Sequence, residues 1–200
     1  MALAKVNTLV RHQVSSVQLI APAKGKRIPA TAGLVGIGRG RTILITQPIK
    51  EHFSQRELEA VLAHEAAHDW RDGVISTCFQ LAAFMFALLT PEWLMSITGN
   101  SWLDDRMDPE LFLALLLLAY FVTVPLLNSI VTWRELRADL EAAALVGSAA
   151  VAEMFTHLTF LNQSNPTPPT IARLFVPGHP SLQARLINLG YDFTHHDKSY

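Results

Sequence analysis

Residues 64–68 read His-Glu-Ala-Ala-His, a spacing that can bind a metal ion from one face of a helix. Positions i and i+4 of an α-helix share a face, so the imidazoles of His64 and His68 can reach the same ion. Glu65 is rotated by about 100° from His64, which brings its carboxylate near a water on the metal without making it a ligand. The pattern predicts Zn²⁺ bound by His64 and His68, with Glu65 as the general base of a hydrolysis.

A catalytic zinc site normally has three protein ligands, and Glu135 is the candidate for the third. The extended pattern HExxHxxGxxH is excluded, because this chain has Arg71 and Val74 where that pattern needs glycine and histidine. Asp139 follows Glu135 by one helical turn and can accept the second ring N–H of a ligating histidine. By position alone, an exposed Glu135 paired with a neighbouring arginine is an equally good interpretation.

The HEAAH stretch needs a helix, and the preceding residues predict where that helix begins. Ser54 and Glu57 match a capping box, in which the hydroxyl and the carboxylate bond to free backbone N–H groups at a helix start. The helix is expected to continue to about Asp72.

A small sheet and further helices are expected around it. Residues 15–22 and 42–46 are β-rich, and residues 31–37 between them form a weaker, glycine-containing candidate strand. The glycines of 36–40 favour a hairpin turn over a phosphate-binding loop, because a strand follows them. The other predicted helices run through 136–145 with a stop at Gly147, through 149–161, and through 181–189.

Apolar residues make up 50% of the 200 residues and charged residues only 16%, against about a quarter charged in ordinary soluble domains. The excess lies in residues 74–98 and 111–133, which flank a charged loop. About 20 apolar residues cross a bilayer as a helix, so these segments predict a two-helix transmembrane hairpin inserted between the two zinc-binding motifs. A buried helical hairpin in a soluble protein, for example within an oligomer, is the alternative.

The charges predict an orientation for that hairpin. The loop at 99–110 carries four acidic residues and one arginine, a net charge of −3, whereas the other 15 of the 16 Lys and Arg residues lie outside it. Because short loops rich in Lys and Arg stay in the cytoplasm, we expect a multi-pass protein of the inner or cytoplasmic membrane whose active site faces the cytoplasm.

Composition also excludes several classes of protein. The net charge of −1 gives no basic field for nucleic acid, and a single cysteine, Cys78, excludes an internal disulfide framework. No cleavable signal peptide is expected in the first 30 residues. Five histidines without a partner at ligand spacing are interpreted as surface or tail residues: His12, His52, His157, His195 and His196.

The pairing of His-Glu-Ala-Ala-His with the downstream Glu-Leu-Arg-Ala-Asp at 135–139 resembles the Glu-x-x-Ala-Asp gluzincins. These are membrane zinc metalloproteases of the HtpX heat-shock protease and CAAX prenyl protease type. Residues 58–63, 128–129 and 179–189 are similar to that family's other conserved-looking stretches, so that the resemblance covers roughly residues 15–190. The chain resembles a short form without transmembrane helices before the catalytic domain.

The resemblance implies an α+β fold: one zincin-like metallopeptidase domain over residues 1–200, with a small sheet packed on the HExxH helix and the hairpin as an insertion. It implies that His64, His68 and Glu135 bind zinc and that Asp139 lies behind them. It also makes His179 a candidate donor to the oxyanion of the tetrahedral intermediate; a loop histidine held in a turn by Pro180 is the alternative. Arg185 would pair with Asp139 or near Glu135, or would be an ordinary surface arginine.

The expected activity is a zinc-dependent endopeptidase that hydrolyses membrane-associated or misfolded polypeptides. The segment 31–37 is a candidate edge strand to which an extended substrate adds by backbone hydrogen bonds. The alternative is a non-catalytic, zinc-stabilised membrane scaffold or sensor, which would have no use for Glu65. The sequence defines neither the physiological substrate nor the oligomeric state.

Overall fold

The computed structural model describes residues 14–36, 38–68, 109–169 and 179–191, together with residues 74, 77–82, 84–86, 89 and 171. The chain forms two compact units. Unit 1 comprises Met1–Trp70, Trp133–Pro168 and His179–Tyr200, and unit 2 comprises Arg71–Thr132 and Pro169–Gly178. Every residue proposed from the sequence for the zinc site belongs to unit 1.

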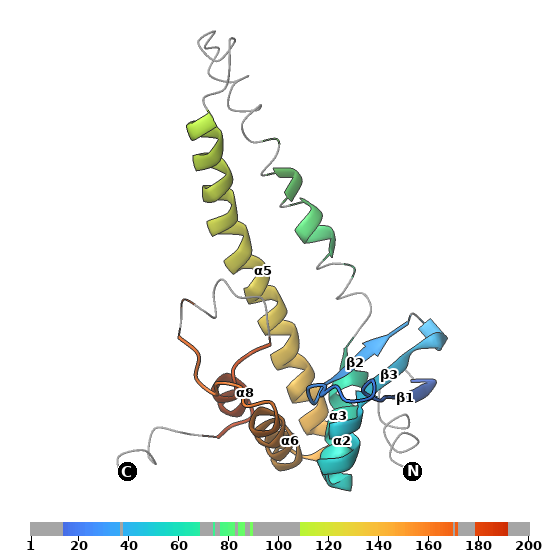
Figure 1. The fold of residues 1–200 in the computed structure, drawn as a ribbon. Coiled ribbons are helices and arrows are strands. Elements are labelled where there is room, and N and C mark those ends of the chain that lie inside the picture. Colours follow the sequence, from blue (N-terminus) through green and yellow to red (C-terminus); the bar gives the residue numbers. More distant parts are fainter. Residues whose placement is uncertain are drawn as a thin grey trace. The chain divides into compact units, whose positions relative to one another are not determined.

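Unit 1 contains a three-stranded mixed sheet (Figure 1). The strands are β1 (Ser16–Ile20), β2 (Ala32–Val35) and β3 (Thr42–Thr46), arranged in the order β1-β3-β2. β3 pairs in parallel with β1 and antiparallel with β2. The predicted hairpin between β2 and β3 is present: Gly36 has a φ of 89°, and a Cβ there would lie 2.4 Å from the Gly40 carbonyl oxygen. Only glycine fits that turn, and β2 is left at an edge of the sheet.

The zinc-motif helix is α3 (Gln55–Ala67), and it begins with the predicted capping box. The Ser54 hydroxyl accepts from the Glu57 N–H, and a Glu57 carboxylate oxygen accepts from the Ser54 N–H at 2.7 Å. Burial alone would raise the pKa of Glu57, but hydrogen bonds from Ser54 and His157 lower it overall. The short helix α2 (Gln47–His52), which the sequence did not predict, precedes α3 and begins with Pro48 in its first turn.

Helix α6 (Ser148–Leu161) packs against α3, and α5 (Pro109–Val146) and α8 (Leu182–Asn188) contribute to the same core. Helices α6 and α8 lie close to the predicted ranges, and Gly147, with a φ of 92°, separates α6 from α5. The main core joins buried side chains of α2, α3, α5, α6 and α8, including Ile49, Val61, Ala142, Val151 and Leu186. A second core packs Leu62 and Ala66 of α3 against Ile43 of β3. Burial on both sides fixes the orientation of α3 between the sheet and α6.

His157 was predicted to be a surface residue, and the structure corrects this. Its Nδ1 lies 2.8 Å from a carboxylate oxygen of Glu57, and its ring stacks on Phe53 at 4.8 Å between centroids. His157 therefore ties α6 to the start of α3. A contact between residues 100 positions apart leaves no local signal in the sequence.

The end of α3 also differs from the prediction. The helix was expected to reach about Asp72, but it ends at Ala67, and His68 has extended backbone angles. Arg41, which is 1% exposed, accounts for this end. Its guanidinium donates to the carbonyl oxygens of Ala66 at 3.3 Å and His68 at 2.5 Å. A cation bonded to the last carbonyls stabilises a helix end.

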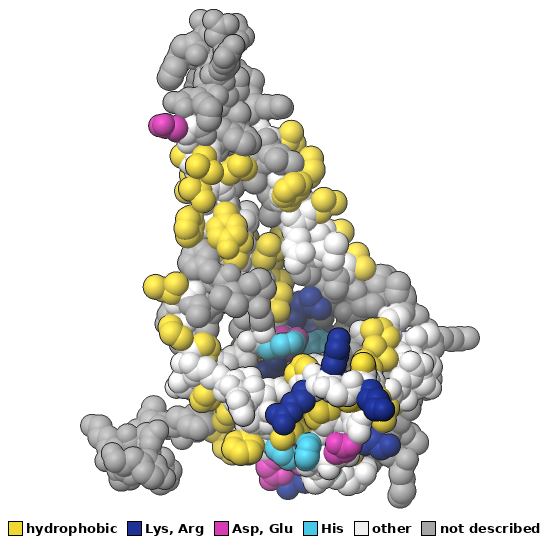
Figure 2. All heavy atoms as spheres, viewed as in Figure 1, with side chains coloured by type: hydrophobic (Ala, Val, Ile, Leu, Met, Phe, Trp, Pro, Cys, Tyr) yellow, Lys and Arg dark blue, Asp and Glu magenta, His cyan; other side chains and the backbone are white. Residues whose placement is uncertain are grey.

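Helix α5 is continuous over 38 residues, where the sequence analysis expected an apolar helix and a second helix after it. Pro125 lies inside it, and the Ser129 hydroxyl donates to the Pro125 carbonyl at 2.8 Å. The stretch Leu116–Val146 is long enough to cross a membrane, and its most apolar window of 18 residues has a mean hydropathy of 1.7. In the unit 2 part of α5, Leu118, Phe121 and Val122 are exposed, and Figure 2 shows hydrophobic side chains gathered over this helix. Helix α5 includes the whole of the second predicted span.

The first predicted span, 74–98, lies largely outside the described residues. Where it is described, residues 77–82 and 84–86 are helical. The structure therefore contains one helix that meets the length and composition of a membrane span within its described part. The two-helix hairpin stays a prediction.

Candidate active site

The side chains of His64, His68 and Glu135 converge on one point. The two Nε2 atoms lie 3.3 Å apart. The carboxylate oxygens of Glu135 lie 3.6 Å from His64 Nε2 and 3.4 Å from His68 Nε2. Helix α3 supplies His64, His68 follows directly after the end of α3, and α5 supplies the glutamate, so that two segments more than 60 residues apart in sequence meet here.

These separations fit a zinc ion. Ligand atoms at 2.0–2.1 Å from Zn²⁺ in a tetrahedral arrangement lie about 3.3–3.4 Å from one another. The separation of the two Nε2 atoms is within about 0.3 Å of that value, and so is the separation of each from its nearer Glu135 oxygen, Oε2 for His64 and Oε1 for His68. Two imidazoles and a carboxylate are also a donor set that zinc accepts, and they leave the fourth position open. His64, His68 and Glu135 can therefore hold a metal ion.

Behind the three candidate ligands lies a buried set of charged groups. His64 Nδ1 lies 2.9 Å from an Asp139 oxygen, and Asp139 is fully buried. Arg185, 3% exposed, donates to Asp139 at 2.5 Å and to Glu135 at 2.7 Å. The Arg185 guanidinium also lies 4.0 Å from the centre of the Phe155 ring. One arginine thus holds both carboxylates, and one of these carboxylates faces the far side of the His64 ring.

His179 lies at the open side of the group. Its Nδ1 is 2.8 Å from Glu135 Oε2, while its side chain is 76% exposed. The structure therefore places His179 beside the cluster, where its ring contacts both a candidate ligand and solvent. Its predicted role as a donor to an oxyanion stays a prediction.

The charges around the histidines favour a cation. Burial alone would lower the pKa of His64, but hydrogen bonds with Asp139 and Glu135 raise it to about 9. Burial and the proximity of His64 lower the pKa of His68 to about 4. Without a bound metal, the carboxylates of Asp139 and Glu135 therefore stabilise one positive charge, on His64, rather than two.

Glu65 has a different environment. It is not part of the ligand cluster, and burial raises the pKa of its carboxyl, with the charge of His64 opposing that effect. A carboxylate with a raised pKa is a better proton acceptor near neutral pH than an ordinary glutamate.

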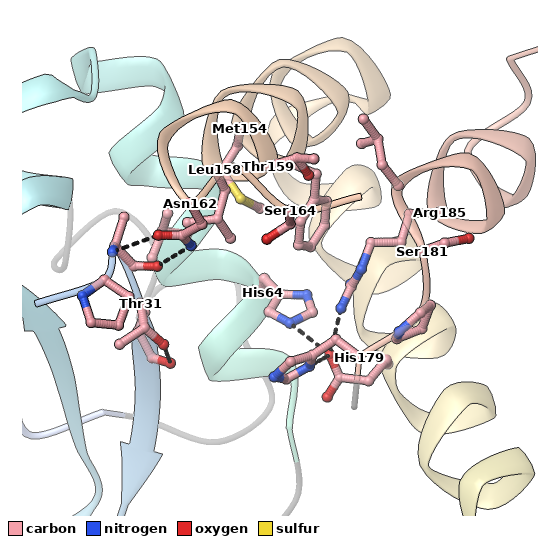
Figure 3. Close-up of a pocket in the computed structure, with 18 of the residues that line it drawn as sticks. Thr31, His64, Met154, Leu158, Thr159, Asn162, Ser164, His179, Ser181 and Arg185 are labelled. Carbon is pink, nitrogen blue, oxygen red and sulfur yellow. Dashed lines mark hydrogen bonds and ion pairs between the residues drawn. The ribbon is translucent and has the colours of Figure 1, made fainter. Parts of the chain in front are cut away.

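A cavity of about 470 Å³ lies beside the cluster. His64, Glu65 and Glu135 lie in its wall, and the close-up shows His179 and Arg185 on one side with Thr31 and Asn162 on the other (Figure 3). Met154, Phe155 and Leu158 of α6 make much of the remaining wall apolar. A largely apolar cavity with a few convergent polar groups is the usual form of a small ligand site.

Two residues of this site were not found by sequence reasoning. Phe155 packs edge-on against the His64 ring at 5.3 Å between centroids, and Asn162 bonds to the start of β2. Phe155 lies in an ordinary apolar helix and carries no signal in the sequence. Asn162 ends α6 just before a loop rich in proline, a position at which asparagine is common for local reasons alone.

The sequence matches peptidase family M48 over residues 12–192, which is nearly the whole chain. The chain belongs to this family. This match confirms the resemblance that the two motifs indicated. A comparison with curated proteins found no match.

The fold of the M48 chain is similar to that of Ste24p from S. mikatae, with a TM-score of 0.63 and 20% sequence identity. The match covers 94% of this chain and 49% of Ste24p, so this chain spans about half the length of that protein. The predicted α+β metallopeptidase fold, with a small sheet beside the HExxH helix, is confirmed at this level. Family M48 is a family of peptidases.

Proposed function

We propose that this protein is a zinc-dependent endopeptidase that cleaves membrane-associated or misfolded polypeptides. The observation that carries the proposal is the convergence of His64, His68 and Glu135 beside a cavity that Glu65 also lines. A non-catalytic zinc module would need the three ligands but would gain nothing from a half-buried carboxylate with a raised pKa beside them.

When bound, zinc would acidify a water molecule and polarise the peptide carbonyl. Glu65 takes the proton from that water as the general base and returns it to the leaving amine. Asp139 holds the His64 ring from behind, and Arg185 fixes Glu135 and Asp139 together. His179, exposed at the cavity, donates to the developing oxyanion.

The substrate backbone binds along β2. An edge strand offers unpaired N–H and C=O groups that an extended peptide can use, and Thr31 and Ala32 at the start of β2 line the cavity. The apolar wall formed by Met154, Phe155 and Leu158 favours an apolar side chain next to the cleaved bond. Folded proteins do not present an extended backbone of this kind, so unfolded segments are the preferred substrates.

The activity is tested on the purified full chain with an unfolded protein as substrate. We expect new peptide termini, identified by mass spectrometry, that disappear when a chelator is added. Zinc bound at one ion per chain without any cleavage would instead favour the scaffold or sensor function and would reject the peptidase.

We further propose that segments 74–98 and 111–133 cross the membrane as a hairpin, with the site in the cytoplasm. The zinc motif precedes both segments and Glu135 follows them, so the chain must cross an even number of times for the ligands to meet. Arg56, Arg71, Arg134 and Arg137 near the span ends support the cytoplasmic side.

Single-cysteine labelling tests this topology in a Cys78→Ser background. An impermeant thiol reagent should modify Asp105→Cys from outside intact cells and Lys50→Cys only after lysis. Labelling of Lys50→Cys alone from outside would show the opposite orientation. Labelling of neither until lysis would support the buried hairpin of a soluble protein.

A further inference from the structure

A side chain bonds to the backbone just before β2, in line with the free edge of that strand. Asn162, the residue that follows the end of α6, bonds to both backbone groups of Ala30 (Figure 3). The Ala30 N–H donates to Asn162 Oδ1 at 2.8 Å, and Asn162 Nδ2 donates to the Ala30 carbonyl at 2.7 Å. The amide thus makes the pair of hydrogen bonds that a neighbouring strand would make.

The register of the sheet shows which other groups are open. Thr46 donates from its N–H to the Thr31 carbonyl at 3.0 Å, and Gly33 pairs with Leu44. Backbone groups alternate between the two sides of a strand, so Thr31, Gly33 and Val35 face β3. Ala30, Ala32 and Leu34 therefore face outward.

The outward backbone groups differ in their partners. Asn162 bonds to those of Ala30, whereas those of Ala32 and Leu34 lie on the open edge of β2. Among the described residues, the one hydrogen bond to these open groups comes from the Thr31 hydroxyl to the Ala32 carbonyl, at 3.3 Å.

The hydrogen bonds between Asn162 and Ala30 lie beside the candidate active site. Ala30, Thr31, Ala32 and Asn162 all line the cavity that contains His64 and Glu65. A peptide that pairs with Ala32 next to the site meets the Asn162 amide two positions further along. We propose that the side chain of Asn162 closes the edge of β2 and limits how far a substrate extends along it on one side of the cleaved bond. This inference rests on the proposed peptidase function and on strand addition at β2.

The test is a ladder of peptides that share one cleavable bond and grow by one residue at a time on either side. For the wild-type full chain, kcat/KM should rise with length on one side until the peptide reaches Ala32, and then rise no further. In Asn162→Ala, the freed groups of Ala30 can pair with the longer peptides. Their kcat/KM should increase by about tenfold, the value of one or two added hydrogen bonds, while the shortest peptides are unaffected.

Two further variants separate this role from a structural one. Asn162→Asp keeps the acceptor for the Ala30 N–H and frees only the carbonyl, so it should give a partial increase even if Asn162→Ala folds poorly. Asn188→Ala removes a comparable bond, from Asn188 Nδ2 to the Leu136 carbonyl at 2.8 Å, away from β2. Its length profile should match the wild type.

The results of these experiments distinguish a failure of the proposed closure from a failure of the proposed peptidase function. Identical length profiles for the wild type and for both Asn162 variants would overturn the closure while leaving the peptidase intact. No cleavage of any peptide by the wild type would reject the proposed function, and the closure with it. Binding of the ladder to a Glu65→Gln chain, measured by fluorescence anisotropy, should show the same length limit without turnover.

Discussion

Replacing Glu65 by glutamine should leave the zinc content and the fold intact and reduce turnover by about 10²–10⁴-fold. Glutamine has nearly the same shape, and Glu65 lies outside the ligand cluster of His64, His68 and Glu135. It cannot accept the proton of the attacking water, so the chemical step loses its base. The measurement is kcat/KM on an unfolded substrate, with zinc per chain determined on the same samples.

Glu59→Gln is the matched control, because it makes the same change on the same helix at a position that bonds to Gln55 at the helix surface. It should cleave at a rate close to that of the wild type. Unchanged cleavage by the Glu65 variant would remove Glu65 from the mechanism and leave the zinc site without a base.

Replacing Glu135 should weaken zinc binding by more than about 100-fold, since the loss even of a residue behind the ligands costs 10–100-fold. Alanine would also leave the buried Arg185 with one carboxylate fewer, and an unpaired buried charge destabilises a fold. Glu135→Gln is therefore measured beside Glu135→Ala, because the amide keeps the volume and a hydrogen-bond acceptor but lacks the negative charge. Zinc affinity is measured by competition with a chelator of known affinity.

Glu141→Ala serves as the control on the same helix, where Glu141 accepts a 2.9 Å bond from Arg137 in an exposed pair. It should retain zinc fully. His64→Ala and His68→Ala should lose zinc as Glu135→Ala does. Full zinc retention in both Glu135 variants would show that another residue completes the site.

The local parts of this fold could be predicted because their causes are local. The capping box at Ser54 and Glu57 fixes the start of α3, and Gly147 marks the break between α5 and α6. The turn at 36–40 between β2 and β3 needs glycine, because a side chain at Gly36 would collide with Gly40. In each case the signal lies within a few residues of the feature.

The features that were missed depend on residues distant in sequence. α3 ends at Ala67 because Arg41 bonds to its last carbonyls, and no residue near Ala67 indicates this. The six residues of α2 are too few to show a helical period. The continuity of α5 was missed because the change from apolar to charged residues near 133 suggested a boundary where the backbone has none.

The candidate site also combines features that the local sequence indicates with features that depend on distant residues. The spacing within residues 64–68 and within 134–139 indicated each half of the zinc site, but not that the halves meet. That pairing came from a resemblance to known peptidases, and the distances between His64, His68 and Glu135 now support it. The cavity wall formed by Phe155 and Asn162 comes from the packing of α6, which the sequence of α6 does not reveal.

The most direct measurement is a zinc titration of the chelated, purified full chain, with cleavage of an unfolded substrate followed at each addition. The peptidase proposed here predicts that activity rises linearly and reaches its maximum at one zinc per chain. A Glu65→Gln chain should bind the same single zinc without gaining activity. Cleavage that persists in the metal-free chain, or a metal-loaded wild type that cleaves nothing, would contradict the account.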